Sequence, residues 1–276
     1  MTVSRRLTDG TRYLALRRYS TPRSSHEAAK LIAREVDALT VVRDSRVPVA
    51  AIVGADPHAT HCEYPSLLLD YLPGSALLLE PGIAGRVPLL AQTLVDIHSM
   101  VLATKPPVFQ ALTTPESVVI PASGDRALWA RAVELIDGPT PAYRPVPLHG
   151  DFQPGNVLFD VTATNGAAVS GVIDWSGLCW GPVDFDVAHC ATNLALLHGV
   201  SWAHRFVESY EAAGGVLISS HDARRYWLVR DALACSEEFR AWAAPWRRAG
   251  RTDLTDEVVE SRLCMYLERM MDAGGG

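Results

Sequence analysis

Features that mark several protein classes are absent from this sequence of 276 residues. No apolar run approaches the roughly 20 residues of a transmembrane helix, so we expect no membrane span. The first residues are polar and charged, unlike a secretory signal peptide. The five cysteines are scattered, odd in number and without a Cys-x-x-Cys pair, which disfavours a disulfide framework and predicts reduced thiols in a cytoplasmic protein.

An excess of basic residues is absent as well. The 25 Lys and Arg residues stand against 31 Asp and Glu residues, which gives a formal net charge of -6 at pH 7. Proteins that bind nucleic acid usually carry a basic surface, so we expect no nucleic-acid partner. With 48% hydrophobic residues the composition is that of a folded globular protein, and the length suits two lobes or one large domain. The oligomeric state is left open.

The most informative stretch runs from Leu148 to Trp175. Two short apolar runs within it, Asn156 to Phe159 and Val169 to Ile173, are typical of buried strands. Between them, Thr162 to Gly166 is rich in turn-forming residues. The stretch therefore predicts a hairpin with polar residues at one edge.

Three oxygen-bearing side chains come to that edge. Asn156 opens the first strand, Asp174 follows the second, and Asp151 lies a loop's length away. Two carboxylates and an amide suit a hard cation such as Mg²⁺, which takes oxygen ligands and usually keeps a phosphate among them. Zinc is disfavoured because no Cys or second His comes at ligand spacing. A surface turn with a few solvated carboxylates is the plainer interpretation.

The spacing of these residues matches a protein-kinase catalytic loop. In kinases an Asp serves the substrate hydroxyl, while a later Asn and a distal Asp after a strand hold magnesium. Asp151 and Asn156 are five residues apart, which is the kinase spacing. The neighbours differ, because His149 begins His-Gly-Asp in place of His-Arg-Asp, and Asp174 lies in Ile-Asp-Trp where kinases have Asp-Phe-Gly.

At these residues the chain resembles the aminoglycoside phosphotransferase and choline kinase-like family of small-molecule kinases. The runs HGDFQPGNVL and VIDW are similar to its two signature blocks, and GPVDFDVA is similar to the segment after them. The resemblance implies a two-lobed, protein kinase-like α+β fold. Residues 1–73 would form a small sheet lobe that binds the nucleotide, and residues 74–276 a mainly helical lobe for catalysis and substrate binding.

The same resemblance implies a reaction and a role for each matching residue. The γ-phosphate of ATP or GTP would pass to a hydroxyl of a small molecule, with Mg²⁺ as cofactor. Asp151 would orient that hydroxyl and accept its proton, and Asn156 and Asp174 would hold the magnesium. His149 and Asp186 would support the catalytic loop.

The amino-terminal residues resemble a nucleotide-binding lobe. Asp9-Gly10, between expected strands Thr2 to Leu7 and Thr11 to Tyr19, is a hairpin turn signal. Leu-Ala15-Leu-Arg17 is similar to the kinase strand Val-Ala-Ile-Lys, where the small residue leaves room for a purine and the cation meets phosphates. Arginine grips phosphate oxygens bidentately, although an exposed strand cation is the plainer interpretation of Arg17.

A helix is predicted over residues 24–42, opened by a capping box at Ser24. Glu35 lies on its apolar stripe, and a carboxylate that faces a core needs a partner. We expect Arg17 to be that partner, which recreates the Lys-Glu pair of active kinases. The alternative is that Glu35 lies at the margin of the stripe and reaches solvent.

Two more strands are expected, Val47 to Val53 and Ser66 to Leu72, before a chain reversal at Pro73-Gly74. The run LLLDYLPG resembles the family's hinge between lobes, whose backbone groups bind the adenine edge. By that resemblance the carbonyl of Asp70 and the amide of Leu72 are the adenine-binding groups.

A glycine-rich phosphate loop is absent, because neither Gly-x-Gly-x-x-Gly nor a Walker-type motif occurs. In the family a strand and a glycine-bearing loop precede the first hairpin, and here only about seven residues precede Asp9-Gly10. A short lobe, a start assigned too late, or nucleotide holding by the larger lobe would each explain this. A silent pseudokinase that serves as a binding module is therefore an alternative.

The family also often has Gly-Asp-Pro where this chain has Gly181-Pro182-Val183, so the role of that first Asp is absent or passes to Asp184.

The rest of the chain is predicted to be mainly helical. Residues 102–124 are expected to form a loop, His98 to be a packing residue, and the many Trp and Tyr residues to lie in the core. Asp231, Glu237 and Glu238 form an acidic cluster that either attracts an amine-bearing substrate or is a solvated helix face. The predicted helices are a helix from Val87 that ends near His98, Asp125–Ile136, Val183–His198, Ser201–Ala213, Ser220–Arg248 with an interruption at Pro245, and Thr255–Asp272.

The acceptor is not fixed by any motif. The family phosphorylates aminoglycosides, macrolides, other antibiotics and ordinary metabolites, so we expect a hydroxylated antibiotic and a resistance enzyme, with an amino alcohol or sugar as the alternative. A protein kinase is disfavoured because Asp174 and Asp186 are twelve residues apart and no Ala-Pro-Glu follows. That spacing leaves no room for a segment that docks a peptide.

Overall fold

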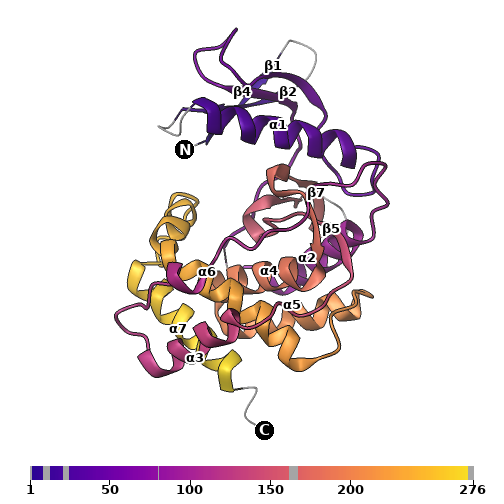
Figure 1. Cartoon of the computed structure of the whole chain (residues 1–276). Coiled ribbons are helices and arrows are strands. Elements are labelled where there is room, and N and C mark those ends of the chain that lie inside the picture. Colours follow the sequence, from indigo (N-terminus) through magenta and orange to yellow (C-terminus); the bar gives the residue numbers. More distant parts are fainter. Residues whose placement is uncertain (1, 9–12, 21–24, 80, 162–166, 273–276) are drawn as a thin grey trace.

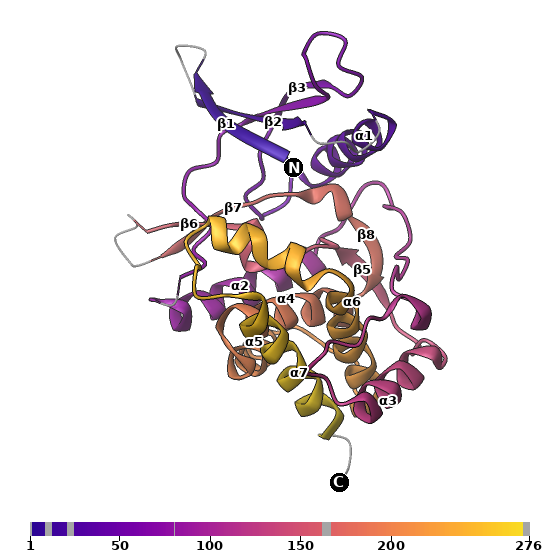
Figure 2. The same ribbon diagram turned by 90° about the vertical axis from the view of Figure 1, so that its left-hand side faces the viewer.

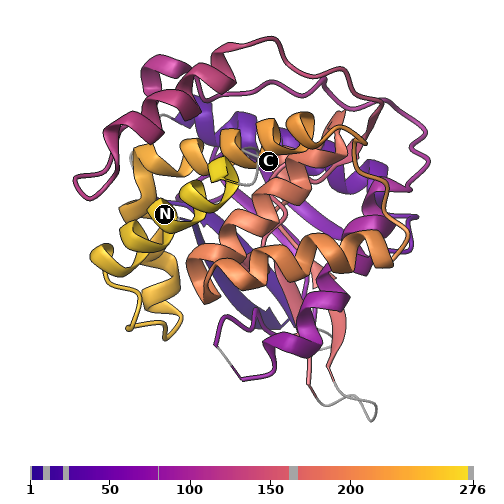
Figure 3. The same cartoon turned by 90° about the horizontal axis from the view of Figure 1, so that it is seen from below.

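The computed structural model describes residues 2–8, 13–20, 25–79, 81–161 and 167–272. A four-stranded sheet with one helix lies above a mainly helical part that also carries two small sheets (Figures 1 and 2). Seen from below, the helices of the larger part lie in front of the strands (Figure 3). Buried apolar side chains from both parts form one continuous core. This is the α+β arrangement that the sequence predicts.

The upper sheet has the antiparallel strand order β1-β2-β4-β3. Its first two strands pair along their whole length, which confirms the predicted hairpin, whereas the Asp9-Gly10 turn and Ser24 lie outside the described residues. The helix α1 places Ile32 and Leu39 in the core shared with Leu67 of the sheet. The elements are β1 (Thr2–Thr8), β2 (Tyr13–Tyr19), α1 (Ser25–Val42), β3 (Ile52–Asp56) and β4 (Ser66–Asp70).

The third strand lies further along the chain than predicted, over Ile52–Asp56 rather than Val47 to Val53. Proline cannot donate to a strand ladder, so Pro48 disfavours a strand that begins at Val47. The segment bonds to two other elements instead. The carbonyl of Pro48 accepts from the amide of Val172 in the lower hairpin at 2.9 Å, and the carbonyl of Ala51 accepts from the amide of Asp70 in β4 at 2.8 Å. This segment therefore ties the upper sheet to the lower hairpin.

The lower strands are β5 (Pro145–Leu148), β6 (Val157–Asp160), β7 (Ala168–Val172) and β8 (Cys179–Pro182). The antiparallel pairing of β6 with β7 confirms the predicted hairpin, although its turn at 162–166 lies outside the described residues. Ser75 and Phe159 exchange two backbone hydrogen bonds of 3.1 and 3.0 Å. Ser170 Oγ donates to the carbonyl of Pro73 at 2.6 Å. The chain is thus fastened to the hairpin where it leaves the upper sheet.

The helix α4 (Val183–His198) is the centre of the larger part and has the predicted bounds. All of its 16 residues except Val183 and Phe185 are buried. A helix that is buried all round has helices on several sides, and α5 to α7 surround it here (Figure 2). The other helical elements are α2 (Ile83–His98), η1 (Pro115–Ser117), α3 (Arg126–Asp137), η2 (Pro154–Asn156), η3 (Trp175–Gly177), α5 (Val200–Ala212), α6 (His221–Arg248) and α7 (Asp256–Asp272).

Two helix predictions are corrected. The helix α2 begins at Ile83, four residues before the predicted start at Val87, and ends at His98, as predicted. The helix α6 continues through Pro245 to Arg248 without the predicted interruption. Because Pro245 lies in the last turn and a half, its ring removes only one hydrogen bond near the end of a long helix.

The predicted packing of the aromatic residues is confirmed for Tyr226, Trp227 and Trp246, which are buried in the core. The side chain of Phe239 lies outside the described residues. All five cysteines are free thiols. Among the described residues, no helix is long and apolar enough to cross a membrane.

Gly74 is predicted to be indispensable at the junction between the two parts. Its φ is +96°, and an added Cβ would lie 2.4 Å from Ser170 Oγ and 2.6 Å from the carbonyl oxygen of Phe159. Gly74→Ala should lower the free energy of unfolding by about 2 kcal/mol or more, measured by urea titration. Gly54→Ala is the matched control, since no atom lies within 4 Å of its added Cβ. Equal stability of the two variants would contradict the strain argument.

Candidate active site

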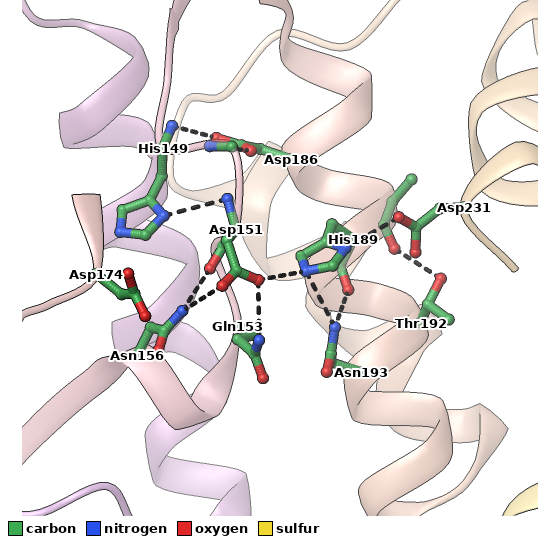
Figure 4. Close-up of polar contacts among 12 residues, drawn as sticks. His149, Asp151, Gln153, Asn156, Asp174, Asp186, His189, Thr192, Asn193 and Asp231 are labelled. Carbon is green, nitrogen blue, oxygen red and sulfur yellow. Dashed lines mark hydrogen bonds and ion pairs between the residues drawn. The ribbon is translucent and has the colours of Figure 1, made fainter. Parts of the chain in front are cut away.

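The loop that follows β5 carries the candidate catalytic residues (Figure 4). The loop turns at Gly150, whose φ is +82°. A Cβ at this position would lie 2.1 Å from the carbonyl oxygen of Gly177, so only glycine lets the loop approach η3 this closely. This close approach fixes the path of the backbone immediately before Asp151.

The buried carboxylate of Asp186, on α4, is hydrogen-bonded to the backbone of this loop. Its oxygens accept hydrogen bonds from the amide of His149 at 2.7 Å and from the amide of Gly150 at 3.0 Å. His98 Nε2 lies 3.3 Å from the same carboxylate, and its Nδ1 lies 2.7 Å from the hydroxyl of Tyr210. The bracing contact expected of Asp186 is present, and His98 is the packing residue that was predicted.

His149 is fully buried beside the loop. Its Nε2 donates to the carbonyl of Ile173 at 3.1 Å, and its ring packs on Trp175 with a centroid separation of 4.6 Å. Its Nδ1 accepts from the amide of Asp151 at 3.3 Å. Burial lowers the pKa of His149, so the ring is neutral and able to donate with one nitrogen and accept with the other. His149 therefore joins the catalytic loop to the end of β7.

Asp151 is held by hydrogen bonds at both carboxylate oxygens (Figure 4). Oδ2 accepts from Asn156 Nδ2 at 3.0 Å, while Oδ1 accepts from Gln153 Nε2 and from His189 Nε2, each at 2.9 Å. Burial acts to raise the pKa of Asp151, but the hydrogen bond and charge of His189 outweigh it and the pKa lies below its ordinary value. The side chain is 41% exposed, so a bound molecule can reach it.

Asn156 and Asp174 lie beside Asp151 at the same edge of the hairpin (Figure 4). Asn156 Nδ2 also donates to the backbone carbonyl of Asp151 at 2.8 Å, which leaves the amide oxygen as the group for a ligand. Asp174 adopts a left-handed backbone conformation with φ of +65°, unusual for a residue other than glycine and typical of functional sites. The structure thus brings together the three side chains that the sequence predicts to gather.

The donor set fits magnesium. No group of three or more His, Cys, Asp or Glu residues suited to a metal occurs in the part of the chain that the structure describes. Mg²⁺ is commonly held by only one or two protein carboxylates, with phosphates and water completing its coordination. One carboxylate from Asp174 and one amide oxygen from Asn156 therefore suit a magnesium ion that arrives with a nucleotide, and do not suit zinc.

Arg17 connects the upper sheet to this edge. Its Nη1 donates to Glu35 Oε1, which confirms the predicted pair, and Tyr19 donates its hydroxyl to Glu35 Oε2 at 3.3 Å. Arg17 Nη2 also lies 3.2 Å from Asp174 Oδ2, a contact that the sequence did not predict. Both side chains of the Arg17 and Glu35 pair are largely buried. A cation on β2 therefore reaches the candidate metal ligand across the junction.

The remaining candidate nucleotide-binding residues lie along the end of the upper sheet. Ala15 of β2 is paired with Leu69 of β4, and Asp70 is the last residue of β4. The side chain of Leu72 packs against Gly171 of β7, where an added Cβ would lie 2.7 Å from Leu72 Cδ1. Contact with adenine remains a prediction for these residues.

Asp184 contacts a different part of the chain from Asp186, and whether it takes the role of the family's first Asp stays a prediction. Both of its carboxylate oxygens lie 3.4 Å from the amide of Ile218, in the segment between α5 and α6. The loop amides of His149 and Gly150 donate to Asp186. Burial raises the pKa of Asp184 to about 6.

His189 and Gln153 are the site residues that sequence reasoning missed, and Asp231 was placed in the wrong environment. Asp231 is neither in a solvated face nor in a substrate-attracting cluster, because it is 4% exposed and its Oδ1 lies 3.0 Å from His189 Nδ1. The side chains of Glu237 and Glu238 lie outside the described residues. The sequence position of His189 could have indicated that it lies near the site, because it follows Asp186 by about one turn of the same buried helix.

Comparison with known proteins identifies relatives of this arrangement. The family model for the phosphotransferase enzyme family, APH, matches residues 2–228. No curated protein matches the chain.

Several solved structures have the same fold. A thermostable mutant of aminoglycoside phosphotransferase APH(4)-Ia, in a ternary complex with ADP and hygromycin B, has a TM-score of 0.62 at 15% identity, covering 99% of this chain and 95% of that one. The GDP and kanamycin complex of APH(2")-IIIa has a TM-score of 0.57 at 18% identity, with coverages of 99% and 94%. Macrolide 2'-phosphotransferase type I has a TM-score of 0.57 at 19% identity, with coverages of 96% and 86%. These similarities establish the two-lobed, kinase-like fold.

The buried Asp184 gives a pH prediction with a definite sign. An unfolded Asp has a pKa of about 4, whereas the native pKa is about 6, so the native state binds more protons between these values. The contribution of this group to stability is therefore present below pH 4 and lost as pH rises through about 6. Asp184→Asn cannot ionise, so it should exceed wild type in unfolding free energy by on the order of 2 kcal/mol above pH 7 and match it near pH 4.

Urea unfolding of wild type and variant at pH 4.5 and 7.5 would measure this difference. Asp186→Asn is the comparison variant in the same helical turn, and it should be less stable than wild type at both pH values because an acceptor of a loop amide is lost. An Asp184→Asn protein no more stable than wild type at pH 7.5 would contradict the prediction.

Proposed function

Because the chain belongs to the phosphotransferase enzyme family, we propose that it transfers the γ-phosphoryl group of ATP or GTP to a hydroxyl of a small molecule. The observation that carries this proposal is the gathering of Asp151, Asn156 and Asp174 at one edge of the β6–β7 hairpin, with Arg17 reaching it from the upper sheet. Residues 1–73 would form the nucleotide-binding lobe and residues 74–276 the catalytic and substrate-binding lobe.

The arrangement of Asp151 suits this reaction. Phosphoryl transfer proceeds through a loose transition state, so positioning and charge neutralisation contribute more than strong proton abstraction. A carboxylate with a lowered pKa is a weak base, yet it orients an acceptor hydroxyl and takes its proton late in the reaction. The hydrogen bonds at both of its oxygens hold it in one orientation.

Asn156 and Asp174 would hold a magnesium ion that neutralises charge on the nucleotide phosphates. The ion pair with Glu35 fixes the orientation of the Arg17 side chain. Arg17 would bind phosphate oxygens with guanidinium N–H groups that do not donate to Glu35. Its contact with Asp174 keeps the cation within reach of the same phosphates. Ala15, the carbonyl of Asp70 and the amide of Leu72 would receive the adenine or guanine ring.

We propose a hydroxylated antibiotic as the acceptor, and with it a role in resistance. Supporting this, solved structures of the same fold are described as complexes with hygromycin B and kanamycin and as a macrolide phosphotransferase. A metabolite such as an amino alcohol or sugar is the alternative acceptor. A silent pseudokinase is the alternative to an enzyme, motivated by the absence of a glycine-rich motif.

One cavity favours an acceptor with few charged groups within this class. It has a volume of about 440 Å³ and is lined by three aromatic rings without a charged side chain. The lining ring of Phe109 packs on Phe185 at 4.4 Å, and Phe185 stacks on His189, the partner of Asp151. Aromatic faces suit apolar or sugar-ring surfaces better than a molecule with many ammonium groups. The lining residues are Phe109, Ala111, Thr140, Pro141, Ala142, Tyr143 and Trp227.

Two substitutions separate transfer from binding. Asp151→Ala should retain binding of MgATP or MgGTP but lose several orders of magnitude in turnover, because the group that orients the acceptor is gone. Asp174→Ala should weaken binding of the magnesium nucleotide as well. Thermal-shift titration measures binding and phosphate release measures turnover. Equal transfer rates in wild type and Asp151→Ala would rule out the mechanism.

A screen for phosphate uptake from labelled ATP and GTP identifies the acceptor. Macrolides, aminoglycosides, amino alcohols and sugars should be compared side by side, and the cavity predicts a higher kcat/KM for compounds with few or no ammonium groups than for aminoglycosides. The Asp151→Ala protein is the control for contaminating kinases. Nucleotide binding without turnover on any compound or on water would favour the pseudokinase.

A further inference from the structure

We infer that His189, itself held by Asp231, is a positioning residue that fixes Asp151 for phosphoryl transfer; the inference rests on the function proposed above. The three residues come from separate elements, which are the catalytic loop, α4 and α6 (Figure 4). His189 lies between the two carboxylates. It does not lie among the candidate magnesium ligands, so its part in the site is distinct from theirs.

The hydrogen-bond geometry determines the protonation of the ring. His189 Nε2 lies 2.9 Å from Asp151 Oδ1, and Nδ1 lies 3.0 Å from Asp231 Oδ1. An ionised carboxylate only accepts hydrogen bonds, so each ring nitrogen must donate. A ring that donates from both nitrogens is an imidazolium. Both hydrogen bonds are therefore assisted by charge, and such bonds are shorter and stronger than those between neutral groups.

The surroundings of the ring keep it in place. Phe185 stacks on it at 6.2 Å between centroids, and Trp242 approaches edge-on at 5.7 Å. Asn193 Nδ2 lies 3.4 Å from His189 Nε2, but that amide nitrogen donates at 2.9 Å to the backbone carbonyl of His189. Burial acts to lower the pKa of His189, yet the carboxylates of Asp231 and Asp151 raise it well above its ordinary value.

An imidazolium at this place cannot take up the proton of an acceptor hydroxyl, so His189 does not act as a base. Its contribution is to occupy Asp151 Oδ1 while Asn156 occupies Oδ2, which prevents the carboxylate from rotating. Asp231 supplies the second negative charge that keeps the ring protonated inside the core. Asp151, His189 and Asp231 together carry two negative charges and one positive charge. The imidazolium of His189 therefore leaves a net negative charge at the site for magnesium and the acceptor hydroxyl.

Kinetic variants test the positioning role with a defined probe, phosphate release from MgATP or MgGTP with water as acceptor. His189→Leu should lower kcat by about 10²-fold, because a small misplacement of a catalytic group has effects of this size, with KM for the nucleotide changed less than about threefold. His189→Gln offers an N–H donor without charge and should recover at least about tenfold of that loss. Asp231→Asn should lower kcat in the wild-type background and have no further effect in His189→Leu.

His198→Gln is the matched control. His198 is a buried histidine on the same helix, near Arg251 rather than Asp151, and its substitution should change stability without changing kcat. If His189→Leu loses activity only through KM or in proportion to the unfolded fraction, or if Asp231→Asn has equal effects in both backgrounds, the positioning role is wrong.

A spectroscopic test is independent of activity. The protein contains nine histidines, which can be labelled with ¹⁵N. At pH 8, both ring nitrogens of His189 should have the ¹⁵N chemical shifts of protonated nitrogens, and the two protons bound to them should resonate downfield. These signals should be absent from His189→Gln and altered in Asp231→Asn. A neutral His189 at pH 8 would overturn the inference. Wild-type protein that shows the imidazolium but releases no phosphate and modifies no acceptor would instead contradict the proposed function.

Discussion

The position of the catalytic loop depends on one buried carboxylate, that of Asp186. A charge removed from water is strongly unfavourable unless hydrogen bonds compensate it, and two backbone amides of the loop supply that compensation. Because Asp186 belongs to α4, a helix whose residues are nearly all buried, the loop is attached to an element that local unfolding seldom opens. Asp151 and Asn156 take their positions from this attachment, and His149 extends it to the end of β7.

The junction between the lobes is built from polar contacts of different kinds. Arg17 reaches Asp174 from β2, the carbonyl of Pro48 accepts from Val172, and Gly74 passes close to Phe159. All three contacts end on the β6–β7 hairpin or directly after it. The β6–β7 hairpin therefore fixes the relative positions of the groups that a nucleotide at this junction would contact. In the same way it lets Arg17, on the small sheet lobe, reach a site in the other lobe.

Much of the fold was predictable because its signals are local. The apolar runs of the hairpin, the Gly199 stop after α4 and the apolar stripe of α1 each depend on residues within a few turns or strand lengths. Predictions failed where a distant partner competes with local preference. The residues after Val47 bond to β7 rather than extending a strand. The continuation of α6 past Pro245 has a local reason instead, because the proline lies near the end of the helix.

The sequence by itself determined the family resemblance, the α+β architecture and the choice of Asp151, Asn156 and Asp174 as candidate site residues, because spacing along the chain carries these features. It also determined the Arg17 and Glu35 pair, since a carboxylate on an apolar stripe demands a cation. Only the tertiary structure decided that Asp231 is buried, that His189 joins it to Asp151, and that Arg17 also reaches Asp174. The physical reason is that hydrogen bonds between α4, α6 and the loop link residues 38 and 42 positions apart, and no local pattern encodes which buried polar groups will meet.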